Sequence, residues 1–159
     1  MLDRVAGKPI VLIGFSMGAA IALQEAAGDA RITAVVAVSS FSDLRTAAAE
    51  RVPFFASKGN IADAFKLAEE EGKFRADDVS PVAAAAHIVA PTLIVHGERD
   101  GETAPDEARR IFAALHDPKR LIMVAGADHK HVISAQVWSD IDGWIDTAVA
   151  PRAPAAAAK

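Results

Sequence analysis

Residues 14–18, Gly-Phe-Ser-Met-Gly, place a serine between two glycines, directly after the apolar run 9–13 and before small residues that begin at Ala19. A serine hydroxyl is a weak nucleophile, so it has to be presented to a substrate and to a base at once. A tight turn from a strand into a helix presents Ser16 in this way, and small neighbours let the helix pack close to the strand. The pattern therefore predicts a nucleophile elbow, with the Met17 backbone N–H at the helix start available to an oxyanion.

A serine nucleophile needs a base and an acid that orients the base, and candidates for both follow apolar runs further along the chain. Asp100 lies in the loop after the run 92–96, and His129 lies in the loop after the run 121–125. In a parallel sheet these loops emerge at the same end, where open α/β folds bind ligands. We therefore expect Ser16 to meet both residues there, in the chain order Ser, Asp, His.

Other titratable residues compete for these positions. Asp43 and Glu98 are alternative acids, and His131 is an alternative base. Asp128 adjoins His129, and we expect it to cap its own loop rather than to orient the ring. His129 and His131 could also form a metal pair, but the sequence offers no further ligand at a suitable spacing, so we expect no metal.

Four short apolar runs indicate strands that are buried on both faces, because none of them alternates with polar residues. They are residues 9–13, 32–38, 92–96 and 121–125. Continuous apolar strands are typical of parallel sheets, and helical stretches between them are typical of α/β folds. We therefore predict an α/β fold with about four parallel strands and flanking helices.

Helix signals lie between these runs and after the last one. Ser80 followed by Pro81 predicts an N-cap and a first helical turn. Thr103 and Asp106 resemble a capping box at the start of the next helix. Apolar spacing predicts further helices over 17–27, 61–71 and 133–148.

The stretch 41–80 is longer than a simple connection between strands. It contains Phe41, the aromatic residues 53–55 and the predicted helix 61–71. Two interpretations stay open, namely a cap-like insertion that lines an acyl pocket and a structural excursion that covers the sheet edge. Phe15, beside the serine, and Phe41 are the candidate residues of a substrate pocket.

The composition is that of an ordinary globular chain with one domain. Its 159 residues carry a net charge of −4 without a basic block, so nothing points to nucleic acid. The absence of cysteine excludes disulfides and a cysteine nucleophile. No run predicts a membrane span or a targeting signal, so we expect a cytoplasmic protein. Residues 150–159 predict a disordered Ala/Pro tail after a domain over 1–149.

Together these motifs resemble the C-terminal half of an α/β-hydrolase, from the nucleophile elbow onward, in the esterase, lipase and serine-aminopeptidase-like group. The resemblance is carried by residues 14–18, 80–81, 91–100 and 126–129. It implies a catalytic triad with Ser16 as nucleophile, Asp100 as acid and His129 as base. It also implies hydrolysis of an ester, thioester or amide of a small or acyl substrate through an acyl-enzyme, with no cofactor.

Two other functions stay open beside a carboxylic ester hydrolase or a peptidase-like serine hydrolase. An acyltransferase would use the same triad and transfer the acyl group to an acceptor other than water. Alternatively, the chain is an inactive hydrolase-like fragment or an interaction module that needs a partner chain.

In the family, a second oxyanion donor comes from a loop after an earlier strand, which pairs beside the elbow strand. The residues before the run 9–13 have no room for either, so we expect a partial fold whose N-terminal strands are missing. Residues 1–5 would end the helix that precedes the elbow strand. The strand at 9–13 would be an open apolar edge. We expect truncation of a longer hydrolase, or pairing of this edge in a homodimer or with a complementing chain.

Overall fold

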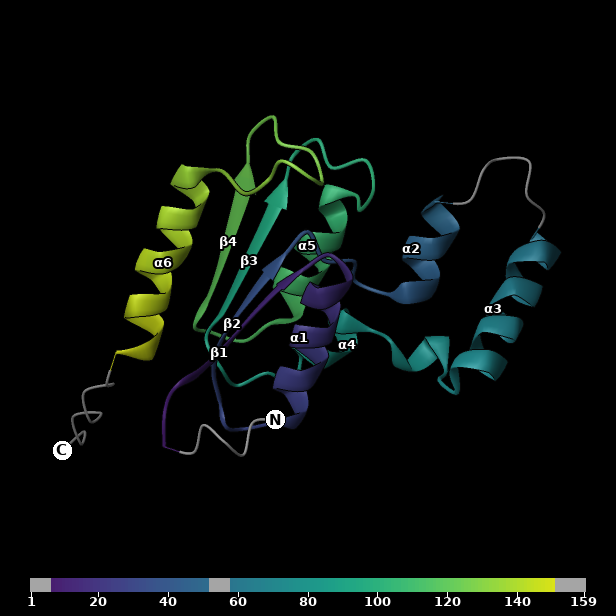
Figure 1. Ribbon diagram of the computed structural model, residues 1–159, viewed down its shortest axis with the longest axis horizontal. Coiled ribbons are helices and arrows are strands. Elements are labelled where there is room, and N and C mark those ends of the chain that lie inside the picture. The colour runs from purple at the N-terminus through teal and green to yellow at the C-terminus, as the bar shows by residue number, and fades with distance from the viewer. Residues whose placement is uncertain (1–6, 52–57, 151–159) are drawn as a thin grey trace.

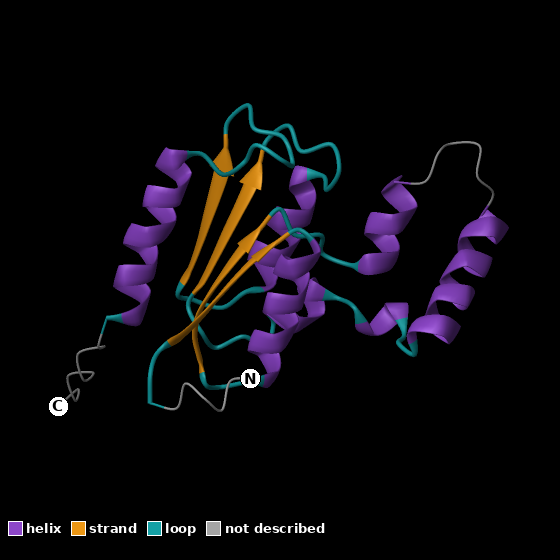
Figure 2. Ribbon diagram, viewed as in Figure 1, coloured by secondary structure: helices purple, strands orange, loops and turns teal. Residues whose placement is uncertain are grey.

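The computed structural model describes residues 7–51 and 58–150 (Figure 1). Strands and helices alternate along the chain, and each predicted apolar run forms a strand (Figure 2). The strands are β1 (Ile10–Phe15), β2 (Ile32–Val38), β3 (Thr92–Gly97) and β4 (Lys119–Val124). The helices are α1 (Met17–Gly28), α2 (Leu44–Arg51), α3 (Lys58–Gly72), α4 (Pro81–Ala85), α5 (Pro105–Ala114) and α6 (Ala135–Val149), with a 3₁₀ turn at Ala76–Asp78.

The four strands form one parallel sheet in the order β1-β2-β3-β4. Their carboxyl ends lie in register, since Phe15 is opposite Val38 and Val38 is opposite Val95. The loops that follow the strands therefore start at the same end of the sheet, toward the top of Figure 1. The predicted α/β fold with parallel strands and flanking helices is confirmed.

Helices cover both faces of the sheet (Figure 1). Ile94 of β3 packs in the core with α1, α4 and α5, whereas its neighbours Leu93 and Val95 pack in the core with α6. Successive residues of a strand point to opposite faces, so a strand between two such cores has to be apolar at every position. Burial of each large aliphatic side chain contributes roughly 1.5–3 kcal/mol relative to exposure.

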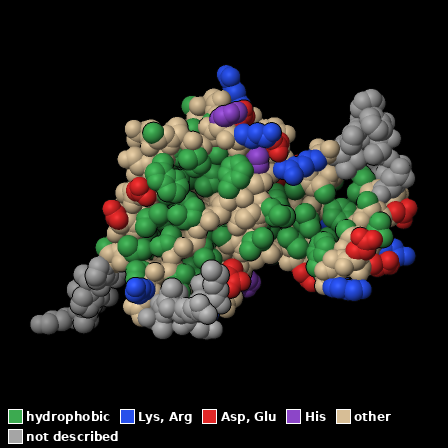
Figure 3. Space-filling view, viewed as in Figure 1, with side chains coloured by type: hydrophobic (Ala, Val, Ile, Leu, Met, Phe, Trp, Pro, Cys, Tyr) green, Lys and Arg blue, Asp and Glu red, His purple; other side chains and the backbone are tan. Residues whose placement is uncertain are grey.

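The two outer strands are less buried than the sequence predicted. Within the described residues, β1 and β4 each pair with one neighbour, and most of their side chains are half-buried or exposed. Ile13 and Phe15 on β1 are 47% and 44% exposed, and Met17 and Ile21 continue the exposed apolar surface along α1. Figure 3 shows hydrophobic side chains gathered on the face between α6 and α1.

Within the described chain, residues 41–51 and 58–80 form a helical arm beside the sheet. Figure 1 shows α3 clear of all four strands, so this helix does not cover a sheet edge. Arg45 of α2 joins the parts of the arm, because its guanidinium bonds to Glu69 and Asp77 and lies 4.7 Å from the centroid of the Phe65 ring.

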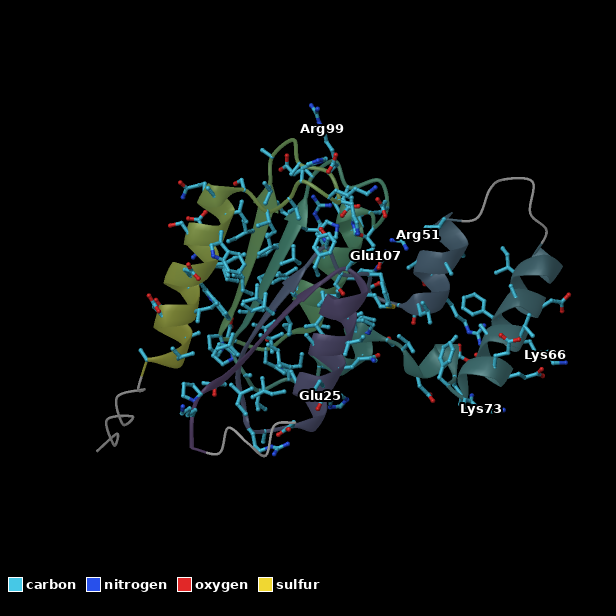
Figure 4. All side chains as sticks on the ribbon, in the orientation of Figure 1. Glu25, Arg51, Lys66, Lys73, Arg99 and Glu107 are labelled. Carbon is cyan, nitrogen blue, oxygen red and sulfur yellow. The ribbon has the colours of Figure 1, made fainter. Side chains whose placement is uncertain are left out.

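The base of the arm is fixed to the body of the molecule at two places. The Ser42 N–H donates to Oε2 of the buried Glu107 at 2.5 Å, and Arg110 Nε donates to Ser42 Oγ at 3.1 Å. Arg51, at the end of α2, donates from Nε to the carbonyl oxygen of Glu102 at 2.8 Å. Figure 4 shows Glu107 and Arg51 at the junction between the sheet and the arm. The arm therefore contacts the loop that follows β3.

Some predictions fall on residues outside the described ranges. They concern the helix end at 1–5, the aromatic residues 53–55 and residues 151–159 of the tail. Within 7–51 and 58–150, no helix combines the length and the apolar character needed to cross a membrane.

Candidate active site

The turn between β1 and α1 holds Ser16 in a backbone conformation that residues other than glycine rarely adopt, with φ 52° and ψ −118°. The Ser16 N–H donates to the Val38 carbonyl at 2.8 Å, which ties the turn to the end of β2. A strained conformation persists only where the surrounding structure enforces it, and such sites are often functional. The strand, turn and helix predicted around Ser16 are present.

The two glycines of the motif differ in their surroundings. A Cβ atom on Gly14 would lie 2.2 Å from the Gly18 carbonyl oxygen, whereas a Cβ atom on Gly18 would meet no described atom within 4 Å. Ala19 and Ala20 are buried, as the close approach of the helix to the strand requires. The predicted close packing of small residues therefore depends on Gly14, whereas Gly18 leaves room for a larger residue.

His129 lies between Ser16 and Asp100. Its Nε2 is 3.0 Å from Ser16 Oγ, and its Nδ1 is 2.8 Å from Asp100 Oδ2. Only 7% of the His129 side chain is exposed, and none of the Asp100 side chain is. A neutral ring with its proton on Nδ1 satisfies both contacts, because Nδ1–H donates to the carboxylate and Nε2 accepts from the serine hydroxyl.

The Asp100 carboxylate is held by four donors. Oδ1 accepts from the backbone N–H groups of Glu102 at 2.9 Å and Thr103 at 2.8 Å. Oδ2 accepts from the Thr103 hydroxyl at 2.9 Å and from the His129 ring. Burial raises the pKa of this carboxyl, but the hydrogen bonds from Thr103, His129 and Glu102 outweigh burial and hold the pKa below its usual range. Asp100 is therefore ionised at neutral pH.

The alternative acids and bases take other positions. Asp43 accepts from the Thr46 N–H at 3.1 Å and caps α2, and Glu98 is exposed. Asp128 accepts two backbone N–H groups of its own loop, so its predicted capping role is confirmed. His131 is exposed and pairs with Asp128 at 2.8 Å. Within the described part of the chain, none of these residues hydrogen-bonds to the serine or to the histidine beside it.

The predicted pocket residues lie in different environments. The half-exposed Phe15 ring is tilted against the His129 ring, with 5.1 Å between their centroids. Phe41 is buried in a small core with Ala20 and Ala47, so its contact with a substrate stays a prediction. Met17 is the first residue of α1, and its N–H therefore has no acceptor within the helix.

Beside His129, an open cavity of about 230 Å³ provides space next to the reacting groups. It is lined by Gly101, Glu102, Asp128, His129 and Lys130. Glu102 Oε2 lies 4.0 Å from His129 Nε2. The described residues 7–51 and 58–150 contain no cluster of three or more His, Asp or Glu side chains that could hold a metal ion.

Two residues near the site have roles that the sequence analysis missed. The residue at the N-cap of α5 is Ala104, without a side-chain cap, so the predicted capping box at Thr103 is wrong. The Thr103 hydroxyl bonds to Asp100 instead. Gly97 lets two loops approach each other, because a Cβ atom there would lie 2.4 Å from the Ala127 carbonyl oxygen. For Thr103, the sequence feature that could have predicted its contact is the three-residue spacing from Asp100, since an aspartate often accepts N–H groups two and three residues later.

A model of the prolyl oligopeptidase family matches residues 3–150. The search of curated proteins gave no match.

Similar solved structures include the esterase domain of a Rhodothermus marinus protein, with 20% identity and a TM-score of 0.67 over 92% of this chain and 63% of that chain. An acetyl xylan esterase from Paenibacillus sp. R4 has 19% identity and a TM-score of 0.72 over 92% of this chain and 49% of that chain. A Pyrococcus horikoshii acylaminoacyl peptidase has 18% identity and a TM-score of 0.64 over 87% of this chain and 24% of that chain. This chain thus spans less than two thirds of each, and the shared part has the α/β-hydrolase fold.

The contrast between the two glycines of the elbow gives a first prediction. Gly14→Ala is expected to lower the free energy of unfolding by about 1–3 kcal/mol or more, because the new methyl group collides with backbone. The matched variant Gly18→Ala is expected to stay within roughly 1 kcal/mol of the parent, since its methyl group faces open space in a helix. Urea unfolding followed by circular dichroism measures both, and equal effects would contradict the close approach at Gly14.

The lowered pKa of Asp100 predicts a pH-dependent contribution to stability. A carboxyl whose pKa is lower in the folded state stabilises the fold above its unfolded pKa of about 3.9, and this contribution is lost as the pH falls through the folded pKa. Asp100→Asn should therefore destabilise the chain most at neutral pH, and its difference from the parent should shrink below about pH 4. Urea unfolding at several pH values tests this, and a constant difference from pH 7 to pH 3 would contradict it.

Proposed function

The chain belongs to the prolyl oligopeptidase family, and on that premise we propose that it carries the catalytic residues of a serine hydrolase. In this proposal Ser16 is the nucleophile, His129 is the general base and Asp100 orients the base. One observation carries it, namely the hydrogen-bonded series from Ser16 Oγ to His129 at 3.0 Å and from His129 to Asp100 at 2.8 Å.

The proposed reaction begins when Ser16 Oγ attacks the carbonyl carbon of the substrate and its proton moves to His129 Nε2. The ring becomes an imidazolium, which the ionised Asp100 stabilises at Nδ1. The carbonyl oxygen takes the negative charge, and the Met17 N–H at the start of α1 donates to it. When the tetrahedral intermediate collapses, His129 returns the proton to the leaving group and an acyl-enzyme forms.

Water then completes the reaction. His129 takes a proton from the water molecule as its oxygen attacks the acyl carbon, and it gives the proton back to Ser16 Oγ when the acid product leaves. The open cavity beside His129 provides space for the water molecule or the leaving group.

We propose an ester, thioester or amide of a small or acyl group as the substrate. The similar structures described as an esterase domain, an acetyl xylan esterase and an acylaminoacyl peptidase support this class. An acyltransferase would use the same steps with an alcohol or amine in place of the water. Product analysis with and without such an acceptor distinguishes the two reactions.

A covalent probe tests the proposed nucleophile. A fluorophosphonate should label the full-length chain at Ser16, since the probe reacts with activated serines, and Ser16→Ala should abolish labelling. His129→Ala should slow labelling by roughly 10⁴-fold or more, because the hydroxyl then lacks its base. His131→Ala is the matched control and should label like the parent, because His131 is exposed and pairs with Asp128.

Intact-mass and peptide-mass analysis read the result. A well-folded parent chain that stays unlabelled, or that is labelled at a residue other than Ser16, would contradict the proposed function.

We also propose that the open β1 edge pairs with a strand of a second copy of the chain or of a complementing chain. The exposed Ile13 and Phe15 of β1 support this, because an apolar parallel edge favours pairing, and Ile21 of α1 continues the exposed apolar surface. Sedimentation velocity should then show self-association that Ile13→Lys weakens, if the partner is a second copy. A chain that stays monomeric at every concentration tested would contradict the homodimer and leave the complementing chain.

A further inference from the structure

Thr103 lies between the two partners of the hydrogen bond that orients His129. It is 1% exposed, and its Oγ1 is 2.9 Å from Asp100 Oδ2 and 3.2 Å from His129 Nδ1. Its own backbone is fixed on both sides, because its N–H donates to Asp100 Oδ1 at 2.8 Å and its carbonyl accepts from His96 Nε2 at 2.9 Å. The hydroxyl is therefore held at a defined place beside both side chains.

Apart from the ring nitrogens of His129 and His96, whose roles depend on the tautomer, the single proton of this hydroxyl has two acceptors within reach. Asp100 Oδ2 is at 2.9 Å, and the carbonyl oxygen of Ser39 is at 3.3 Å. The shorter distance and the negative charge both favour the carboxylate, since charge-assisted hydrogen bonds are the stronger ones. With its proton directed at Asp100, Oγ1 keeps its lone pairs for the Nδ1–H of His129.

We propose that Thr103 is a positioning residue of the reacting groups, a role that rests on the proposed function of Ser16. Its hydroxyl fixes the rotation of the Asp100 carboxylate and offers the Nδ1–H of His129 a second acceptor. Both contacts favour the ring form that carries its proton on Nδ1, which leaves Nε2 free to accept the proton of Ser16.

Two other titratable groups of the described chain face this cluster. His96 Nε2 lies 3.4 Å from Asp100 Oδ2, and Glu102 Oε2 lies 4.0 Å from His129 Nε2. His96 and Glu102 are the same in Thr103→Val and Thr103→Ser, so a difference in labelling between these two variants reports on the Thr103 hydroxyl.

The test is the second-order rate of fluorophosphonate labelling of the full-length chain between pH 5 and pH 9. Thr103→Val keeps the side-chain shape and removes the hydroxyl, and it should label roughly 10-fold to 100-fold more slowly, as expected for the loss of a hydrogen bond to a charged group. The low-pH limb of its pH–rate profile should move, because the hydroxyl contacts both the carboxylate and the Nδ1 atom that it faces. Thr103→Ser keeps the hydroxyl and should restore the parent rate and profile.

Thr92→Val is the matched control for loss of a buried hydroxyl. Thr92 is fully buried at the amino end of β3, and its hydroxyl donates to the Ala90 carbonyl at 3.0 Å. This variant should label like the parent. If circular dichroism shows that Thr103→Val is unfolded, Thr103→Ala takes its place, since it also lacks the hydroxyl.

The outcomes separate this proposal from the proposed function. A parent that labels at Ser16 while Thr103→Val matches it in rate and profile overturns the role of Thr103 and leaves the hydrolase proposal intact. The role of Thr103 is also overturned if Thr103→Val labels more slowly by the same factor at every pH and Thr103→Ser is equally slow, because the loss of rate is then structural. A folded parent that does not label contradicts the proposed function, and the role of Thr103 falls with it.

Discussion

The buried carboxylate of Asp100 is the group on which the rest of this site depends. An ionised side chain without access to water is costly unless the protein supplies donors. Asp100 receives them from Glu102, from the N–H and hydroxyl of Thr103 and from the His129 ring. Because one donor is the ring that also contacts Ser16, the contacts that stabilise the charge also fix the orientation of the histidine.

The parallel sheet brings these groups together only because its loops can approach closely. Ser16, Asp100 and His129 follow three different strands and still meet within 3.0 Å. Gly14 permits the first approach, between the end of β1 and the start of α1, and Gly97 permits the second, between the loops after β3 and β4. The Arg51 contact with the Glu102 carbonyl then links the loop after β3 to the arm formed by α2 and α3.

The sequence predicted the sheet because strands buried on both faces have to be apolar where they cross the core, and residues 34–38 of β2 and 93–95 of β3 are. It also predicted that Asp100 and His129 follow strand ends, and the structure brings His129 to Ser16 and Asp100 to His129. It could not distinguish Gly14 from Gly18, since that difference depends on how closely α1 returns to the strand. The capping-box prediction at Thr103 failed because the N-cap of α5 is the next residue, Ala104, and the Thr103 hydroxyl donates to the Asp100 carboxylate.

The most direct test of this account is the protonation of the His129 ring in the resting chain. Nitrogen-15 NMR of the full-length protein near neutral pH distinguishes a proton on Nδ1 from a proton on Nε2. The account predicts that the neutral form of the ring carries its proton on Nδ1, hydrogen-bonded to the carboxylate and perturbed in Asp100→Asn. A proton on Nε2, or a ring whose signals do not respond to Asp100→Asn, would contradict it.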